Sequence, residues 1–466
     1  MADGYRTEQD SLGKMQVAEG AMWGAQTQRA VENFPISGLR FPRDFIGALG
    51  MVKYLACQVN RDLGLIDSAL AAAISQAAME VTEGQWDEQF PVDVFQTGSA
   101  TSTNMNANEV IARRASEILA HGGGAGPARQ VHPNDHVNLS QSSNDVIPSC
   151  IHIAALVALE KDLLPSLDRL RSALEAKSKE FAGVLKLGRT HLQDATPMTL
   201  GQEFSGYAAM VAHAIGRLGN AKWHLGELAL GGTAIGTGIN AHADFARKVI
   251  ERLNDLSGME FREAENHFEA QGARDAAVEA SGALKSVAVS LYKIANDIRW
   301  LGSGPRAGLG ELELPAVQPG SSIMPGKVNP VMAEALMMAC AQVIGNDAAV
   351  TFAGAAGNFE LNTMLPLIAY DLLQSMQILT GAASAFEEKC VRGLSADEER
   401  CRETLDRSLA LATALVPRLG YDAAAKLAQD AYANGKTIRQ AALEKGLMKA
   451  EELDGLLDPA KMIGKA

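Results

Sequence analysis

The sequence predicts an all-α protein organised around long helices. Apolar residues recur at gaps of three and four in two long segments, which places them on one face of a helix, as in a helix bundle. Aromatic residues make up only 5% of the 466 residues, and the alternating patterns typical of strands are scarce. Apolar residues make up 47%, which is enough to build a large core.

The two periodic segments lie in the middle of the chain. The first consists of Leu156, Leu159, Leu163, Leu167, Leu170 and Leu174, and the second, at strict heptad spacing, of Leu284, Val287, Leu291, Ile294, Ile298 and Leu301. Pro165 interrupts the first pattern, so we expect a kink there. From about residue 394 the chain turns charged and then forms short amphipathic stretches, which predicts a small separate helical domain.

Composition excludes several classes of function. The net charge of −13 argues against nucleic acid as the main partner, and an anionic substrate would need a local basic pocket. The N-terminus lacks an apolar signal core, and no run approaches the roughly 18 apolar residues of a membrane span. The cysteines are odd in number and widely spread, which suits a reducing compartment: Cys57, Cys150, Cys340, Cys390 and Cys401. We therefore expect a cytoplasmic protein with no membrane partner.

Polar, glycine-rich segments separate the helices. They predict loops at 98–108, 131–144, 188–197, 231–240 and 302–329. The last is too long for a simple connection, and its interspersed apolar residues favour a functional loop over a disordered one. It ends in Gly-Ser-Ser-Ile-Met-Pro-Gly-Lys-Val-Asn-Pro, residues 320–330. Asn329 and Pro330 are typical of a helix start, where backbone amides together with Lys327 favour an anion. A flexible linker is the less favoured interpretation.

Further polar clusters have both a structural and a chemical interpretation. Ser99 and Thr101, and likewise Ser142, Ser143 and Asn144, could cap helices or hydrogen-bond a carboxylate without carrying charge.

Charged and titratable residues also allow two interpretations each. His191, beside Thr190, is the residue type that exchanges protons near neutral pH, although a lone histidine is more often structural. His132, Asp135 and His136 suggest a metal site, but Pro133 argues against a helical pair of ligands. Glu334 either orients a histidine or is an ordinary first-turn acid.

Taken together, these clusters resemble the class II fumarases of the fumarase/aspartase superfamily. The resemblance covers nearly the whole chain, from residues 8–13 and 23–29, through 231–238, to 420–425, and residues 320–330 match the superfamily signature. Aspartases typically have glutamine where His191 stands and alanine where Gly326 stands, so both residues favour the fumarase branch.

The resemblance implies reversible addition of water across fumarate to give L-malate, without metal or organic cofactor. It assigns Ser321 as the proton-abstracting base and His191 as the proton-transfer partner, supported by Glu334. A serine base requires a loop that stabilises an alkoxide, through backbone amides and Lys327. The implied substrate-binding residues are Ser99, Thr101, Ser142, Ser143, Asn144, Thr190, Ser322, Lys327 and Asn329. A second anion site would comprise His132, Asn134 and Asp135.

The resemblance also implies an architecture of three helical domains, at 1–141, 142–394 and 395–466. Four central bundles would form a homotetramer in which each active site takes segments from three subunits. One departure is Ala100, where many class II fumarases have glycine. This departure leaves open a hydratase of a substituted fumarate. An aspartate ammonia-lyase and a catalytically silent relative are the remaining hypotheses, and the intact set of catalytic residues argues against the silent one.

Overall fold

The computed structural model describes residues 4–121 and 130–464 and confirms the all-α prediction. Among these residues the strands form only two-stranded sheets, and helices make up most of the regular structure. The chain divides into two compact units. Unit 1 comprises Met1–Leu164, Gly216–Ser286 and Ala341–Leu379, and unit 2 comprises Pro165–Ile215, Val287–Cys340 and Thr380–Ala466. The predicted division into three domains stays a prediction.

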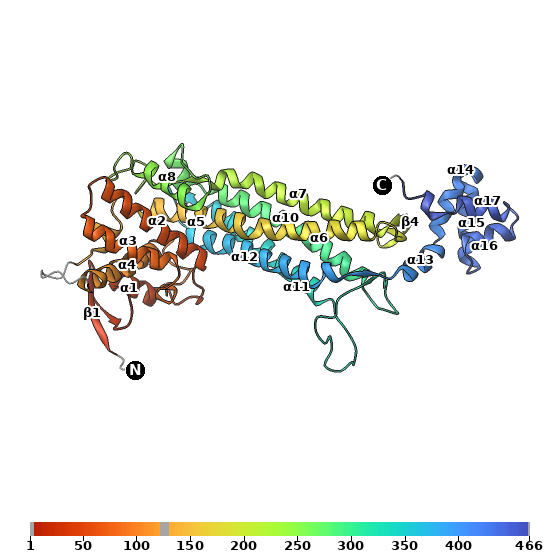
Figure 1. Ribbon diagram of the computed structural model, residues 1–466, viewed down its shortest axis with the longest axis horizontal. Helices are drawn as coiled ribbons and strands as arrows, with labels where there is room; N and C mark the ends of the chain where they lie inside the picture. The colour runs from red at the N-terminus through yellow and green to blue at the C-terminus, as the bar shows by residue number, and fades with distance from the viewer. Residues whose placement is uncertain (1–3, 122–129, 465–466) are drawn as a thin grey trace. The chain divides into compact units, whose positions relative to one another are not determined.

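Unit 1 begins with an antiparallel hairpin that contacts the first helix, which in turn packs against α4 (Figure 1). Its elements are β1 (Tyr5–Asp10), β2 (Gly13–Ala18), α1 (Ala25–Asn33), α2 (Arg43–Asp62), α3 (Ser68–Thr82), α4 (Thr101–His121), the π-helical turn η2 (Pro133–Val137), α5 (Ser143–Ala158), β5 (Glu227–Leu228), α8 (Phe245–Ser257), β6 (Arg262–Glu263), α9 (His267–Gly272), β8 (Gly357–Asn358) and β9 (Leu361–Asn362). Helix α2 packs against α3, α5 and α8, so it lies at the centre of this unit.

Unit 2 carries the second long hairpin and the short helices of the C-terminal region. Its elements are α6 (Leu164–Glu180), β3 (Leu185–Thr190), β4 (Gln193–Thr199), β7 (Leu312–Glu313), β10 (Ser395–Ala396), α13 (Glu398–Asp406), α14 (Val416–Leu419), α15 (Tyr421–Ala433), α16 (Ile438–Glu444) and α17 (Ala450–Leu456). The division between the units falls within four long helices: α7 (Leu200–Leu225), α10 (Asp275–Leu301), α11 (Val331–Gly354) and α12 (Leu365–Lys389).

Both periodic patterns are confirmed, because every apolar residue that marks them is buried. The interruption expected at Pro165 is a π-helical turn, η3 (Leu159–Leu163), between α5 and α6. Proline has no amide hydrogen to donate, and the last amide before it, that of Leu164, donates to Leu159 O in π geometry.

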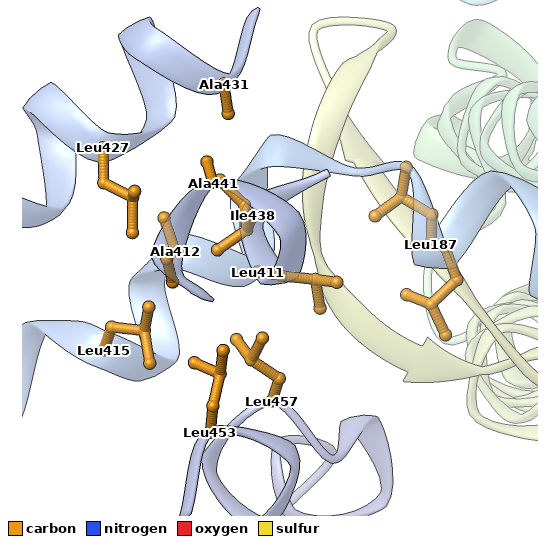
Figure 2. Close-up of a cluster of buried hydrophobic side chains, with 12 residues drawn as sticks. Leu187, Leu411, Ala412, Leu415, Leu427, Ala431, Ile438, Ala441, Leu453 and Leu457 are labelled. Carbon is orange, nitrogen blue, oxygen red and sulfur yellow. The ribbon is translucent and has the colours of Figure 1, made fainter. Parts of the chain in front are cut away.

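The short C-terminal helices share a core of their own. Leu411, Leu415, Leu427, Ile438 and Leu453 point toward one another between the helices, as Figure 2 shows. Leu187 of β3 belongs to the same cluster, so the β3–β4 hairpin is anchored to this core. The amphipathic stretches predicted at 423–432 and 438–447 correspond to α15 and α16.

Four of the five predicted loops are wrong in part. The segment 131–144 contains η2 and the start of α5, and the segment 302–329 contains β7. The segment 98–108 is helical from Thr101, because its asparagines bury their side chains within the unit instead of breaking the helix. The segment 188–197 lies in the β3–β4 hairpin, where Thr190 pairs with Gln193. The short alternation of Leu185, Lys186 and Leu187 is the signal that could have predicted a strand.

A buried group of charges holds the β3–β4 hairpin in unit 2. The Nζ atom of Lys186 lies 2.6 Å from Glu203 and 3.1 Å from Glu311, while Arg189 binds both oxygens of Glu311 at 2.5 and 3.0 Å. Burial acts to raise the pKa of Glu311, but Arg189 and Lys186 outweigh it and hold this pKa below its ordinary value. Since Glu311 directly precedes β7, the charges tie the hairpin to the start of the long loop.

We predict that Glu311→Gln lowers the free energy of unfolding by about 3–5 kcal/mol, because Arg189 loses its counter-charge and buried Lys186 keeps only Glu203. Urea denaturation at one fixed protein concentration measures it. Glu452→Gln, which breaks an exposed pair with Arg418, is the control and should cost less than about 1 kcal/mol. An effect of Glu311→Gln as small as the control would contradict the prediction. Because the pKa of Glu311 is lowered, its contribution is present above the ordinary glutamate pKa and is lost as the pH falls through the lowered one.

Candidate active site

The hydroxyl groups expected to bind a carboxylate meet in unit 1. Ser99 and Thr101 lie 2.7 Å apart, oxygen to oxygen, and Thr101 lies 2.7 Å from Ser143. The start of α4 therefore meets the start of α5, although 42 residues separate Thr101 from Ser143. Ser142 caps α5, because its hydroxyl oxygen accepts from the N–H of Asn144, and its role in binding a carboxylate stays a prediction. We refer to Ser99, Thr101 and Ser143 as the hydroxyl cluster.

The turn between the first two hydroxyls is strained. Ala100 has φ +54°, in the left-handed region that costs a residue with a Cβ atom about 1–2 kcal/mol. Its N–H donates to Thr97 O at 2.7 Å, and its carbonyl accepts from Asn104 N at 3.0 Å as α4 begins. The methyl group of Ala100 is fully buried. The surrounding structure thus enforces a conformation that brings the hydroxyls on either side of Ala100 together.

Asp145 is a site residue that the polar clusters of the sequence did not single out. Its carboxylate accepts from the N–H groups of Ser142 at 2.9 Å, Gly231 at 2.9 Å and Thr233 at 3.1 Å. Next to it, Asn144 Nδ2 donates to Ala234 O at 2.8 Å. The predicted 231–240 loop is therefore fastened to the start of α5. The capping-box pattern of a serine followed three residues later by an acid could have revealed Asp145.

The loop that contains Ser321 folds back on itself in unit 2. The N–H of Gly320 donates to Lys327 O at 2.9 Å, and Asn329 Nδ2 donates to Gly320 O at 2.5 Å. Asn329 was expected at a helix start, but its side chain closes this loop, and α11 begins at Val331. At Gly320 an added Cβ atom would lie 2.5 Å from Lys327 O, so only glycine allows this closure.

Backbone amides of that loop hold the side chain of Ser321 in place. Its Oγ accepts from the N–H of Ile323 at 3.2 Å and of Met324 at 2.9 Å. Ser321 and Lys327 both line a hollow of about 540 Å³. Lys327 is exposed, as is Ser322. Two amides directed at a hydroxyl oxygen, with a cation lining the same hollow, favour the ionised form of that hydroxyl.

His191 stands at the tip of the β3–β4 hairpin. His191 and Leu192 form its two-residue turn, with φ +55° and +59°, values usually taken by Asn-Gly or Gly-Gly pairs. Two residues with side chains in this conformation store strain, which is typical of functional sites. His191 and Thr190 are both exposed.

Among the described residues, no contact supports the roles assigned to Glu334 and to the second anion site. Glu334 is an exposed residue in the first turn of α11, and no hydrogen bond or ion pair joins it to His191 in the part of unit 2 that the structure describes. His132 Nδ1 accepts from Asp135 N at 3.0 Å, within the turn η2, and Asn134 is exposed there. Pro133 starts this helical turn, at a position where the missing N–H of a proline costs nothing.

The structure thus brings the predicted residues together in three groups. The first is the hydroxyl cluster with Ser142 and Asn144, the second is the loop 320–329, and the third is the hairpin tip at 190–191.

The chain matches two families of known proteins. It matches the lyase family over residues 13–345 and the fumarase C C-terminus over residues 411–464.

Individual relatives are similar over almost their whole length. The chain is 54% identical to fumarate hydratase class II of Nitrosomonas europaea over 460 residues, which cover 99% of each chain. It is 56% identical to fumarate hydratase class II of Halobacterium salinarum over 462 residues, covering 99% of this chain and 98% of that one. The crystal structure of recombinant class II fumarase from Schistosoma mansoni matches with a TM-score of 0.95 at 41% identity, covering 99% of both chains. The chain belongs to the class II fumarate hydratases, a family of hydro-lyases.

Proposed function

We propose that this chain catalyses the reversible, stereospecific hydration of fumarate to L-malate, as in the tricarboxylic acid cycle. The observation that carries the proposal is the position of Ser321, whose hydroxyl oxygen accepts two backbone N–H bonds. A serine hydroxyl is a weak acid, so it serves as a base only where its alkoxide is stabilised. Two amides and Lys327 supply that stabilisation within the loop itself.

The proton transfers follow from the assigned groups. In the direction of dehydration, the Ser321 alkoxide takes a proton from C3 of malate, and the electron pair moves into the adjacent carboxylate. Lys327 and Asn329 stabilise the resulting aci-carboxylate. The C2–O bond then breaks, the double bond forms, and His191 gives the leaving hydroxyl the proton that makes it water. Glu334 is assigned to stabilise the charged form of His191.

The hydroxyl cluster suits the second carboxylate of the substrate. Ser99, Thr101 and Ser143 form a continuous row of hydroxyls, each able to donate to an anion, and Asn144 adds a neutral amide. Thr190 and Ser322 are proposed as further donors. Neutral donors bind the carboxylate without adding charge that would compete with the proton transfers at C3.

The exposed face of α11 supports assembly into a homotetramer. Six of its exposed residues recur at gaps of four and three: Glu334, Met338, Ala341, Gly345, Ala348 and Phe352. Small residues flanked by Met338 and Phe352 allow another helix to approach closely, and the spacing is that of a coiled-coil seam. We propose that four chains pack along this seam and that each active site combines the three groups from three subunits.

The same helix has a high mean hydropathy, although Glu334, Asn346 and Asp347 interrupt its apolar residues. By length and composition α11 is apolar enough to cross a membrane, and only 33% of its apolar window is buried within the chain. Contact with other subunits along the proposed seam buries the apolar residues of α11 and so explains why this helix is apolar. The cysteines of the described chain are free and buried, and burial raises the pKa of the Cys57 thiol to about 11. These thiols support the proposal of a cytoplasmic location.

We predict that the purified protein forms fumarate from L-malate and not from L-aspartate. Ultraviolet absorbance of fumarate measures both reactions in parallel cuvettes, in a buffer with a chelator. Fumarate from L-aspartate alone would make the chain an ammonia-lyase. Fumarate from neither would leave a substituted fumarate or a silent relative, and 2-methylmalate in a third cuvette separates those two.

We predict that Ser321→Ala lowers kcat by about 10²–10⁴-fold, because the proton acceptor is removed, while KM changes little. Steady-state kinetics of malate dehydration measures it. Ser395→Ala, which removes an exposed hydroxyl bound to Glu313, is the matched control and should behave as the wild type. Wild-type turnover in Ser321→Ala would exclude Ser321 as the base.

We predict that Lys327→Met raises KM and lowers kcat together, each by about tenfold or more, because the charge acts on both the bound substrate and the transition state. The same assay measures both constants, with size-exclusion chromatography to verify the assembly. A change in KM with kcat unaltered would limit Lys327 to substrate binding.

A further inference from the structure

Helix α2 carries two fully buried polar side chains that reach the segment leading to the hydroxyl cluster. Lys53 and Asn60 are seven residues apart, on one face of the helix, and each is at most 1% exposed. Lys53 Nζ donates to Asn138 Oδ1 at 2.9 Å. Asn60 Nδ2 donates to Leu139 O at 3.0 Å, and Asn60 Oδ1 accepts from Ser140 Oγ at 2.9 Å.

Asn138 connects these contacts to the helix that carries Thr101. Its Oδ1 also accepts from Asn104 Nδ2 and Asn108 Nδ2, both at 3.2 Å, and these two residues are buried on α4. Its Nδ2 donates at 3.1 Å to the carbonyl oxygen of Gln141, which is the residue before Ser142. One side-chain amide therefore links α2, α4 and the start of α5, which are the elements that bring Thr101 and Ser143 together.

The burial of Lys53 is difficult to explain by stability. Taking an ammonium group out of water is costly, and an apolar side chain of similar volume would fit the same space at no loss or with a gain. The hydrogen bond that Lys53 donates within unit 1 goes to a neutral amide oxygen and not to a carboxylate. A costly group bonded to a neutral acceptor points to a role in function.

We propose that Lys53 is a positioning residue for the substrate carboxylate: through Asn138 it holds the hydroxyl cluster in its binding geometry, so that loss of its ammonium group weakens dicarboxylate binding. This inference rests on the proposed function, because the hydroxyl cluster is the carboxylate site of that proposal. Asn60 supports the same segment at Leu139 and Ser140.

The charge of Lys53 responds to pH near neutrality. Burial lowers its pKa to about 7, opposed by electrostatic interactions with Asp145 and Cys150, both on α5. Burial raises the pKa of the Cys150 thiol, so this thiol carries no charge near pH 7. The side chains that reach Lys53 from α4 and the 138–141 segment are linked through amides, which do not titrate. Below pH 7 the ammonium holds Asn138 with a charge-assisted bond, and above it the neutral amine donates more weakly. Dicarboxylate affinity should therefore fall as the pH rises through about 7.

The test compares Lys53→Met with Lys177→Met. Lys177 is a buried lysine of unit 2 that donates to a neutral oxygen, Leu394 O, at 2.6 Å, and also to the carboxylate of Glu180 at 2.8 Å. The dissociation constant of succinate, a dicarboxylate that cannot be hydrated, is measured by calorimetry from pH 6 to 8.5, together with KM and kcat for fumarate. At pH 6 we expect Lys53→Met to raise both the dissociation constant of succinate and KM for fumarate by about tenfold. This is the effect of one lost charge-assisted hydrogen bond, and kcat should change less. Lys177→Met should match the wild type.

The pH profile separates positioning from a general structural defect. The wild type should lose affinity through about pH 7, and this step should be absent in Lys53→Met. Lys53→Gln keeps a donor without a charge, so it should recover part of the affinity without the pH step. If Lys53→Met does not fold, the same measurements are made on Lys53→Gln. Wild-type affinity with the wild-type pH step in either variant would overturn the inference.

A further variant separates this inference from the proposed function. Ser143→Ala removes a hydroxyl of the cluster directly and should weaken succinate binding. Normal binding by Ser143→Ala would contradict the carboxylate site, and with it the inference. Weak binding by Ser143→Ala with normal binding by Lys53→Met would contradict the role of Lys53 alone.

Discussion

The carboxylate of Asp145 is the constraint on which the unit 1 part of the site depends. Buried backbone amides need acceptors, and this one side chain satisfies three of them, one at the start of α5 and two in the 231–240 loop. Because Asp145 and Ser142 satisfy the helix end, Ser143 and Asn144 do not have to cap it. Their polar groups remain available for the row of hydroxyls with Thr101 and for the contact with Ala234.

The same principle operates in unit 2 with the roles reversed. There the backbone amides of Ile323 and Met324 converge on one hydroxyl oxygen, that of Ser321. Glycine at 320 allows the loop to close on itself, and Asn329 gives up a capping position to hold it closed. Preorganised amides cost no rearrangement when charge develops, which supports the proposal that Ser321, although a weak acid, acts as the base.

Three of the residues other than glycine that have positive φ values lie beside the proposed substrate-binding groups. Ala100 beside the hydroxyl cluster, and His191 and Leu192 at the hairpin tip, have positive φ values with side chains larger than hydrogen. Each is held by strong neighbouring structure: a turn and a helix start for Ala100, and the buried charges around Glu311 for the hairpin. Stability elsewhere in each unit offsets the local cost.

The sequence by itself determined the helical class, the two apolar faces and the identity of the residues in the polar clusters. Helical periodicity depends on neighbours three and four residues apart, so it is readable without coordinates, and the signature at 320–330 is contiguous. The hairpin under His191, the closing role of Asn329 and the joining of Thr101 to Ser143 were decided by the tertiary structure. Each depends on hydrogen bonds between residues distant in the chain or on a conformation that local propensity disfavours. The contacts of Lys53 and Asp145 are of the same kind, because a buried polar group takes its partner from whichever segment the packing brings beside it.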